Sequence, residues 1–160
     1  MSARIIITGS ENPVLRRKAK PIERVTKEIK ALIKDMEETM EGKGVGLAAP
    51  QVGESVRLCL IPVNGKDVAA VNPEILSLSA ETTIDEEGCL SLPGMWLQIS
   101  RSVEIVLAYT DSRGKRHERK LTGFEARVAQ HETDHLDGIL MIDRAAPAAL
   151  AAKKVARNAA

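Results

Sequence analysis

Aromatic side chains are nearly absent from this sequence of 160 residues. Only Trp96, Tyr109 and Phe124 carry aromatic rings, which is 2% of the chain, although hydrophobic residues make up 44% of it. A chain of this length can enclose one hydrophobic core without covalent cross-links. We therefore expect a single domain over residues 1–160, with a core built from aliphatic side chains.

Cysteine, long apolar runs and an excess of one charge are also scarce. The two cysteines, Cys59 and Cys89, allow at most one disulfide, and no stretch approaches the roughly 20 apolar residues of a membrane span. The first apolar run is too short for a signal peptide. A formal net charge of +1 gives no electrostatic reason to expect nucleic acid or a membrane as the partner. We expect a cytoplasmic protein whose thiols stay reduced.

The first strong periodic pattern predicts a helix that begins near Val25. Its apolar residues share one helical face; they are Val25, Ile29, Leu32, Ile33, Met36 and Met40. Thr26 is a suitable N-cap, and Gly42 or Gly44 a suitable end. Residues 12–22, which have prolines near both ends, are predicted to form an extended arm or turn on the surface.

Alternating runs between turn residues predict strands in the middle of the chain. We expect strands at 57–63, at 68–71 ending at Asn72-Pro73, and at 103–109, with 115–121 able to pair with the last of these. Residues 44–51 are expected to be a loop or irregular strand, and residues 74–84 to be extended. Helices combined with mostly antiparallel strands predict an α+β fold.

A second helix is predicted at residues 124–136. Thr122 precedes Glu125 by three residues, which is the spacing of a capping box, and Gly138 follows as an end signal. The alanine-rich tail from Ala145 is expected to be at most a marginal helix.

The second predicted helix contains His131-Glu132-Thr133-Asp134-His135, an H-E-x-x-H motif. Four residues turn a helix by about 400°, so both imidazoles project from one face and can bind one metal ion. Glu132 would flank this ion without binding it, where a carboxylate can take a proton from an activated water. The alternative is a helix with two incidental histidines.

A catalytic metal site needs a third protein ligand and an open position for water. After the motif, the chain offers only Asp137 and Asp143 as acidic groups, and no histidine or cysteine. Before the motif, Cys89 follows Gly88 and lies outside any apolar run. Cys59 lies within one and is interpreted as a small buried hydrophobe. Cys89 is therefore the candidate ligand, and a buried structural thiol is the alternative.

Three blocks of the sequence together resemble the peptide deformylase family. They are Gly44-Val45-Gly46-Leu47-Ala48-Ala49-Pro50-Gln51, Glu87-Gly88-Cys89-Leu90-Ser91 and Gln130-His131-Glu132-Thr133-Asp134-His135-Leu136. The resemblance spans residues 5–143, nearly the whole chain. It implies an α+β fold in which mostly antiparallel sheets pack around a central helix that carries the H-E-x-x-H motif.

The resemblance implies removal of formate from N-formylmethionyl peptides emerging from the ribosome, and it leaves proximity to the ribosome open. It implies one divalent metal ion bound by Cys89, His131 and His135. This ion would be Fe²⁺ natively, and Zn²⁺, Ni²⁺ or Co²⁺ could occupy the same site. Composition and ligand types do not decide between these metals.

The resemblance also implies the catalytic roles. Glu132 would be the acid and base, and the Gln51 side-chain amide and Leu90 backbone N–H would donate hydrogen bonds to the developing oxyanion. Without the family pattern, Gln51 would be interpreted as an ordinary surface glutamine after a turn.

In the family the substrate lies extended between the first two blocks, which implies main-chain pairing near Val45, Gly46 and Gly88. The methionine side chain would enter an apolar pocket, for which Val45, Leu90 and Val128 are candidates. Some members of the family carry an arginine a few residues after Pro93, near the substrate mouth, where this chain has Gly94-Met95-Trp96-Leu97. Trp96 either covers the core or edges this pocket.

Two polar residues remain to be interpreted. Asp134 is expected to hold an arginine, with Arg101 as the candidate partner, and His117 is expected to be a solvated surface residue. Two other functions remain open, a zinc endopeptidase that uses the same helix and a non-catalytic relative that binds peptides or metal. The endopeptidase would need a downstream ligand, and the relative would have lost Glu132, Gln51 or a metal ligand.

Overall fold

Strands occupy the middle of the chain and helices lie toward both ends in the computed structural model, which describes residues 2–145. The strands form a five-stranded sheet in the order β1-β2-β3-β6-β7 and a two-stranded sheet of β4 and β5. All of these named pairs are antiparallel. The predicted α+β class with antiparallel sheets is therefore confirmed. The elements are α1 (Pro13–Arg16), α2 (Lys27–Met40), β1 (Leu47–Ala48), the 3₁₀ helix η1 (Ala49–Val52), β2 (Leu58–Val63), β3 (Lys66–Leu78), β4 (Thr82–Gly88), β5 (Trp96–Ser102), β6 (Glu104–Thr110), β7 (Arg116–Thr122), α3 (Gly123–Leu136) and α4 (Met141–Arg144).

Helix α2 forms as its periodicity predicts. Thr26 is the N-cap, and its side chain accepts a hydrogen bond from Ile29 N at 3.2 Å. The apolar face packs against a cluster that includes Leu47 and Leu58. The helix ends at Met40, before the two glycines that were expected to stop it.

The segment before α2 was expected to be an extended arm or turn on the surface; it contains a helical turn, but part of it is buried. Residues 13–16 form the single turn α1, because Pro13 suits the first helical position and Asn12 caps it by accepting from Val14 N at 3.2 Å. Leu15 is completely buried. The block 44–51 was expected to be a loop or irregular strand, and it contains the two-residue strand β1 and enters the unexpected 3₁₀ helix η1.

Strand β3 runs through the predicted stop at Asn72-Pro73. Asn72 adopts a positive φ of 50°, and the pairing with β6 shifts register between Val71 and Glu74. Pro73 has no backbone N–H that could donate a hydrogen bond to the neighbouring strand, and this bulge accommodates it. The Asn72 side chain is fixed by Ile22, donating to Ile22 O at 2.7 Å and accepting from Ile22 N at 2.8 Å. The predicted run 68–71 and the first part of the expected extended run 74–84 are therefore one long strand, and the last part of that run begins β4.

Helix α3 begins where predicted, but the capping prediction is wrong. The Thr122 side chain makes no capping hydrogen bond. Glu125 instead accepts from Asn64 N at 3.1 Å and Gly65 N at 2.9 Å, in the turn between β2 and β3. The first turn of α3 is thus hydrogen-bonded to the β2–β3 hairpin.

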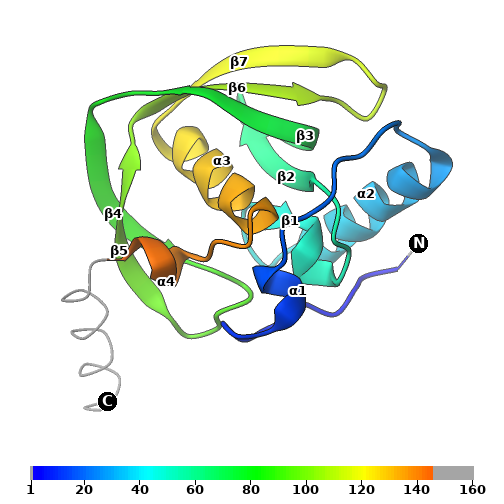
Figure 1. Ribbon diagram of the computed structural model, residues 1–160, viewed down its shortest axis with the longest axis horizontal. Coiled ribbons are helices and arrows are strands. Elements are labelled where there is room, and N and C mark those ends of the chain that lie inside the picture. The colour runs from blue at the N-terminus through cyan, green and yellow to red at the C-terminus, as the bar shows by residue number, and fades with distance from the viewer. Residues whose placement is uncertain (1, 146–160) are drawn as a thin grey trace.

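Helix α3 contacts both sheets, and ten of its residues are buried. Its Ala126, Ala129 and Leu136 join an apolar cluster with side chains of β2 and β6. Figure 1 shows β4 and β5 on the other side of α3 from β2. None of the helices within residues 2–145 has both the length and the apolar character that a membrane crossing would need. The alanine-rich tail after Ala145 lies outside the described residues.

Candidate metal and catalytic site

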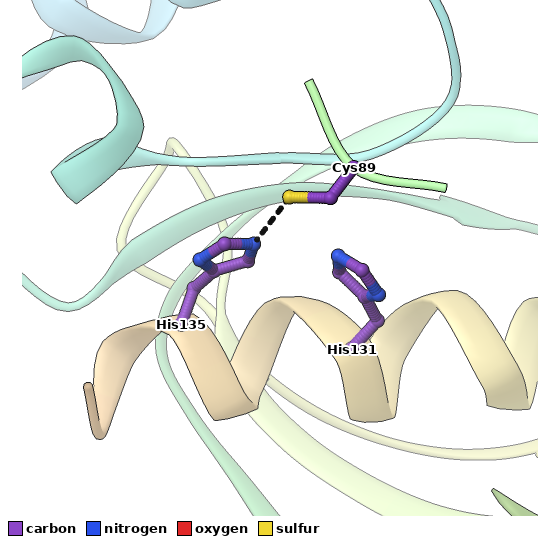
Figure 2. Close-up of side chains that lie close together, drawn as sticks. All are labelled: Cys89, His131 and His135. Carbon is purple, nitrogen blue, oxygen red and sulfur yellow. Dashed lines mark hydrogen bonds between the residues drawn. The ribbon is translucent and has the colours of Figure 1, made fainter. Parts of the chain in front are cut away.

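Helix α3 and the segment after β4 bring one sulfur atom and two imidazole rings together. The ligand atoms of Cys89, His131 and His135 all lie within 4.8 Å of one another, and Cys89 Sγ is 3.4 Å from His135 Nε2. Figure 2 shows both rings projecting from one side of α3 toward Cys89. Residues four apart on a helix share a face, which explains this convergence. A thiolate and two imidazoles form a donor set that Fe²⁺, Zn²⁺, Co²⁺ or Ni²⁺ can use.

The two histidine rings differ in their hydrogen bonds and in the direction of their pKa shifts. Glu87 Oε1 lies 2.8 Å from His131 Nδ1, which directs Nε2 of that ring away from the carboxylate. Burial acts to lower the pKa of His131, but hydrogen bonds with Cys89 and Glu87 raise it to about 10. Burial lowers the pKa of His135 well below its ordinary value, so this ring is neutral. The neutral imidazole is the form that binds metals.

Glu87 also anchors two arginines. Its Oε2 accepts from Arg101 Nε at 2.9 Å and from Arg127 Nη1 at 2.6 Å, and its Oε1 accepts from Arg101 Nη2 at 3.0 Å. Burial acts to raise the pKa of Glu87, but hydrogen bonds with His131 and Arg101 hold it well below its usual range. Glu87 therefore stays ionised and keeps a fixed negative charge behind the His131 ring.

The predicted contact between Asp134 and Arg101 is confirmed. Arg101 Nη1 donates to Asp134 Oδ2 at 2.7 Å, and Arg144 Nη2 donates to Asp134 Oδ1 at 2.8 Å. The carboxylates of Glu87 and Asp134 thus share Arg101, which is only 5% exposed. This chain of alternating charges joins α3 to β4, β5 and α4.

The Glu132 carboxylate is buried beside Gly46. A Cβ atom added to Gly46 would lie 2.5 Å from Glu132 Oε2 and 2.8 Å from Val128 Cγ1, so a larger residue would collide with both. Glu132 Oε1 has no hydrogen-bond partner among the described residues. Burial raises the pKa of Glu132 to about 7. A carboxyl group with this pKa can both take and return a proton near neutrality.

Gln51 is a buried residue of η1 with a fixed amide. Its Oε1 accepts from Ala48 N at 2.9 Å, and its Nε2 donates to Ser91 Oγ at 3.1 Å. Nε2 also lies 3.8 Å from Cys89 Sγ. The backbone N–H of Ala48 can only donate, so it sets which end of the amide faces Cys89.

A pocket of about 500 Å³ collects these groups at the surface. Every predicted site residue except the fully buried His135 lines it; these are Val45, Gly46, Gln51, Gly88, Cys89, Leu90, Val128, His131 and Glu132. Trp96 lines the pocket as well, so of the two alternatives for this residue the structure supports the pocket edge. Phe124 also lines it, at the start of α3.

Sequence reasoning overlooked two residues that organise the site. Glu87 belongs to the second block of the family resemblance, but the sequence predicts no role for it. Nothing in its local pattern shows that it contacts two arginines. Arg127 does carry a signal, because it precedes His131 by four residues and therefore shares the face of the motif. A buried arginine there needs a carboxylate partner nearby.

The sequence also predicts the surroundings of Cys59 and His117, and only the first prediction is right. Cys59 is fully buried, as expected, and both cysteines are free. His117 is not simply solvated, because it stacks on Tyr109 with ring centroids 5.2 Å apart and lies 2.6 Å from Asp111 Oδ2. That expectation was wrong because the β6–β7 register places His117 directly opposite Tyr109.

Comparison with known proteins matches one family. Residues 4–151 match a family described as polypeptide deformylase. A peptide deformylase of Thermotoga maritima is 49% identical over 138 residues, which cover 86% of this chain and 84% of the relative. A peptide deformylase of Dictyoglomus turgidum is 47% identical over 135 residues, covering 84% of this chain and 88% of the relative.

Solved structures give the same similarity. A crystal structure of the Thermotoga maritima peptide deformylase has a TM-score of 0.87 at 46% identity, and the match covers 92% of this chain and all of that one. A class I type b peptide deformylase of Acinetobacter baumannii, with Met-Ala-Ser bound, has a TM-score of 0.83 at 35% identity. That match covers 90% of this chain and 99% of the other.

Proposed function

This chain belongs to the polypeptide deformylase family, and we propose that it removes the N-formyl group from newly made polypeptides. The bond cleaved is the amide between the formyl group and the initiator methionine, and the products are formate and a free amino terminus. One observation carries the proposal. Cys89, His131 and His135 converge within 4.8 Å, and Glu132 and Gln51 line the same pocket as Cys89.

We propose that Cys89, His131 and His135 hold one divalent metal ion, Fe²⁺ in the cell, with Zn²⁺, Ni²⁺ or Co²⁺ as replacements. Three protein ligands leave an open position, which distinguishes a catalytic site from a closed structural one. Glu87 behind the His131 ring supports this assignment, since a carboxylate commonly orients a ligating histidine. When bound, the ion supplies Lewis acidity that lowers the pKa of water.

Glu132 is the proton carrier of the proposed reaction. It takes a proton from the attacking water while the water oxygen forms a bond to the formyl carbon. It then passes this proton to the departing amine as the carbon–nitrogen bond breaks, and formate leaves. Its raised pKa of about 7 supports this role, and so does its buried Oε1, which has no hydrogen-bond partner within residues 2–145.

Gln51 and Leu90 stabilise the charge that develops on the formyl oxygen. The Gln51 amide nitrogen donates from a position set by Ala48 N and Ser91 Oγ, so it needs no reorganisation during the reaction. The backbone N–H of Leu90 is the second donor. Donors that are held in place before the reaction stabilise the transition state more than donors that must first rotate.

The substrate is a formylmethionyl nascent peptide that lies extended along the pocket. Its main chain pairs with backbone groups near Val45, Gly46 and Gly88, and its methionine side chain packs on Val128. The missing side chain of Gly46 supports this arrangement, since it leaves backbone accessible beside Glu132. Contact with the ribosome remains a prediction.

We further propose that α3 is the central helix of a single catalytic domain over residues 1–160. Its burial and its contacts with both sheets support this arrangement. The reaction takes place in the cytoplasm, where translation supplies formylated chains and Cys89 stays reduced.

Release of formate from formyl-Met-Ala-Ser by anaerobically purified, metal-containing protein tests the proposal. We expect formate in proportion to bound metal, while the same peptide without its formyl group stays intact. A zinc endopeptidase would cut internal bonds of longer unformylated peptides, which mass spectrometry detects. A non-catalytic relative would bind the peptide and release nothing. Full metal content without formate would refute the deformylase assignment.

A further inference from the structure

Two of the three aromatic residues of the chain are exposed at one pocket instead of filling the core. Trp96 is 54% exposed and Phe124 is 62% exposed, and both line the pocket that contains Cys89 and Glu132. Leaving a large apolar ring in water forgoes the free energy that its burial would gain. Neither ring takes part in the proposed hydrolysis, so their position requires another explanation.

The Trp96 ring lies over Gly88. The two residues are direct partners in the β4–β5 ladder, so they share one face of this sheet. A Cβ atom added to Gly88 would collide with Trp96 Cζ3 and would lie 2.7 Å from Cε3 and Cη2. The six-membered ring therefore covers Gly88 and is directed across β4. Within residues 2–145, β5 is the one strand that pairs with β4, so an extended peptide could pair with the opposite edge of β4 near Gly88.

Strand alternation decides which side chain of a peptide would meet this ring. Glu87 and its partner Leu97 are buried and Glu87 contacts α3, whereas Gly88 and Trp96 face the opposite way. A peptide whose methionine points toward Val128 on α3 must direct its second side chain to the opposite face. That is the face of Trp96.

The third side chain returns to the α3 side. Phe124, Val128 and Glu132 are spaced four residues apart, so they share one helical face, and all three line the pocket. Four helical residues rise about 6 Å, and two residues of an extended peptide advance about 6.6 Å. With the formyl group at Glu132 and methionine at Val128, the third residue reaches Phe124.

The nearby arginine on α3 is not available for this contact. Arg127 lines the pocket, but its Nη1 donates to Glu87 Oε2 at 2.6 Å and to Ile99 O at 2.9 Å. Its Nη2 donates to Thr83 O at 2.9 Å. The two exposed rings thus offer apolar surface at this end of the pocket.

We propose that Trp96 and Phe124 select substrates with apolar side chains directly after formylmethionine, Trp96 contacting the second residue and Phe124 the third. The inference rests on the proposed deformylase function, because it takes the position of methionine from it. A leucine side chain gains apolar contact at either position, whereas alanine is too short to cover either ring.

Two peptide series separate the two contacts. One varies the second residue in formyl-Met-Xaa-Ser and the other varies the third in formyl-Met-Ala-Xaa, with Xaa as leucine or alanine. We expect the wild type to favour leucine by roughly three- to tenfold in kcat/KM at each position. Trp96→Ala should bring the ratio to about one at the second position only, and Phe124→Ala at the third position only. Trp96→Phe should keep most of the preference.

Ile84→Ala is the matched control. Ile84 is 68% exposed and its partner is Ser100, so it shares the Trp96 face of the same sheet but does not line the pocket. We expect this variant to keep the wild-type ratios. Equal rates for leucine and alanine peptides in the wild type, or a preference that survives Trp96→Ala and Phe124→Ala, would overturn the inference.

Fluorescence gives an independent measurement, because Trp96 is the only tryptophan of the chain. Titration with unformylated Met-Leu-Ser should shift the emission to shorter wavelength with saturation, and Met-Ala-Ser should shift it less. Absence of formate from formyl-Met-Ala-Ser would refute the proposed function. The titration then decides the inference by itself, and equal shifts with both peptides would overturn it.

Discussion

On the side of α3 that faces the five-stranded sheet the contacts are mainly apolar between its two ends, whereas on the side that faces β4 and β5 ion pairs are prominent. The first side packs small and aliphatic residues of α3, such as Ala129, against Ile61 and Leu107. The second side joins Arg127 to Glu87 at 2.6 Å, and further ion pairs continue from Glu87. The same helix is thus held by two different kinds of interaction.

This difference separates stability from orientation. Apolar burial stabilises in proportion to area and sets no particular direction. Buried ion pairs contribute little net stability, because desolvation offsets most of their attraction, but they are directional and fix the atoms that they join. Glu87 therefore determines where the His131 ring points, and the five-stranded sheet determines whether α3 is folded at all.

Removal of the shared charge should have the largest combined effect. Glu87→Gln leaves Arg101 and Arg127 buried without their full partner, which we expect to lower the free energy of unfolding by about 3–5 kcal/mol. Loss of the carboxylate behind His131 should weaken metal binding by about 10- to 100-fold. Urea unfolding and metal competition titrations measure the two effects.

A triple apolar variant separates packing from charge. Glu87→Met combined with Arg101→Met and Arg127→Met removes these three charges and leaves Asp134 paired with Arg144, so we expect stability to return toward the wild-type value. Metal affinity should stay low, since nothing then orients His131. If metal affinity returned together with stability, the charges would have no orienting role.

A cavity on the apolar side should affect stability alone. Leu107 is completely buried, so Leu107→Ala should lower the free energy of unfolding by about 2–5 kcal/mol. Formate release per folded molecule should match the wild type. Leu76→Ala, at a 43% exposed position of β3, is the control and should change stability by less than about 0.5 kcal/mol. Impaired turnover in folded Leu107→Ala would show that the two sides are not separable.

Loss of one arginine should have an intermediate effect. Arg127→Met removes hydrogen bonds to Ile99 O and Thr83 O, for which we expect a cost of about 1–3 kcal/mol in the free energy of unfolding. Glu87 keeps Arg101 and His131, so metal affinity should fall less than in Glu87→Gln. Arg127→Lys should rescue little, since one ammonium cannot reproduce the guanidinium geometry. Equal loss of metal affinity in Arg127→Met and Glu87→Gln would contradict this order.

The smallest effect should come from a hydrogen-bonded pair outside α3, Asp111 and His117. Hydrogen bonding with His117 lowers the pKa of Asp111 from 3.8 to about 2. The resulting stability is present above pH 3.8 and is lost as the pH falls toward 2. Asp111→Asn should therefore be less stable than the wild type at neutral pH, by under about 1 kcal/mol, and the difference should vanish near pH 2. Thermal unfolding of both proteins across this range measures it, and a difference that grew on acidification would contradict the assignment.

Local patterns predicted the two long helices α2 and α3, most strands and the candidate metal ligands, but not the short helices α1, η1 and α4. The three candidate ligands could be found because helical spacing places His131 and His135 on one face and Cys89 is the only cysteine outside an apolar run. The Arg101–Asp134 contact was also anticipated. The contacts of Glu87 with Arg101, Arg127 and His131 were not predicted, because they depend on how β4 and β5 pack against α3. No local pattern encodes this packing.

The missed strand features have similar causes. Strand β5 was overlooked, since its exposed positions include Trp96 and Gln98 and its buried positions include Arg101, so hydrophobic alternation is weak. The prediction divided strand β3 because Asn72-Pro73 usually ends a strand, whereas here a bulge and hydrogen bonds between Asn72 and Ile22 accommodate it. Tertiary contacts outweighed the local signal in both cases.

Metal content and formate release measured on the same sample of Glu132→Gln test the central claim most directly. The substitution keeps the shape of the buried side chain and removes its ability to carry the proton. We predict one metal ion per chain, as in the wild type, and turnover lowered by about 100- to 10,000-fold. Turnover close to the wild-type value with the metal still bound would contradict the proposed reaction.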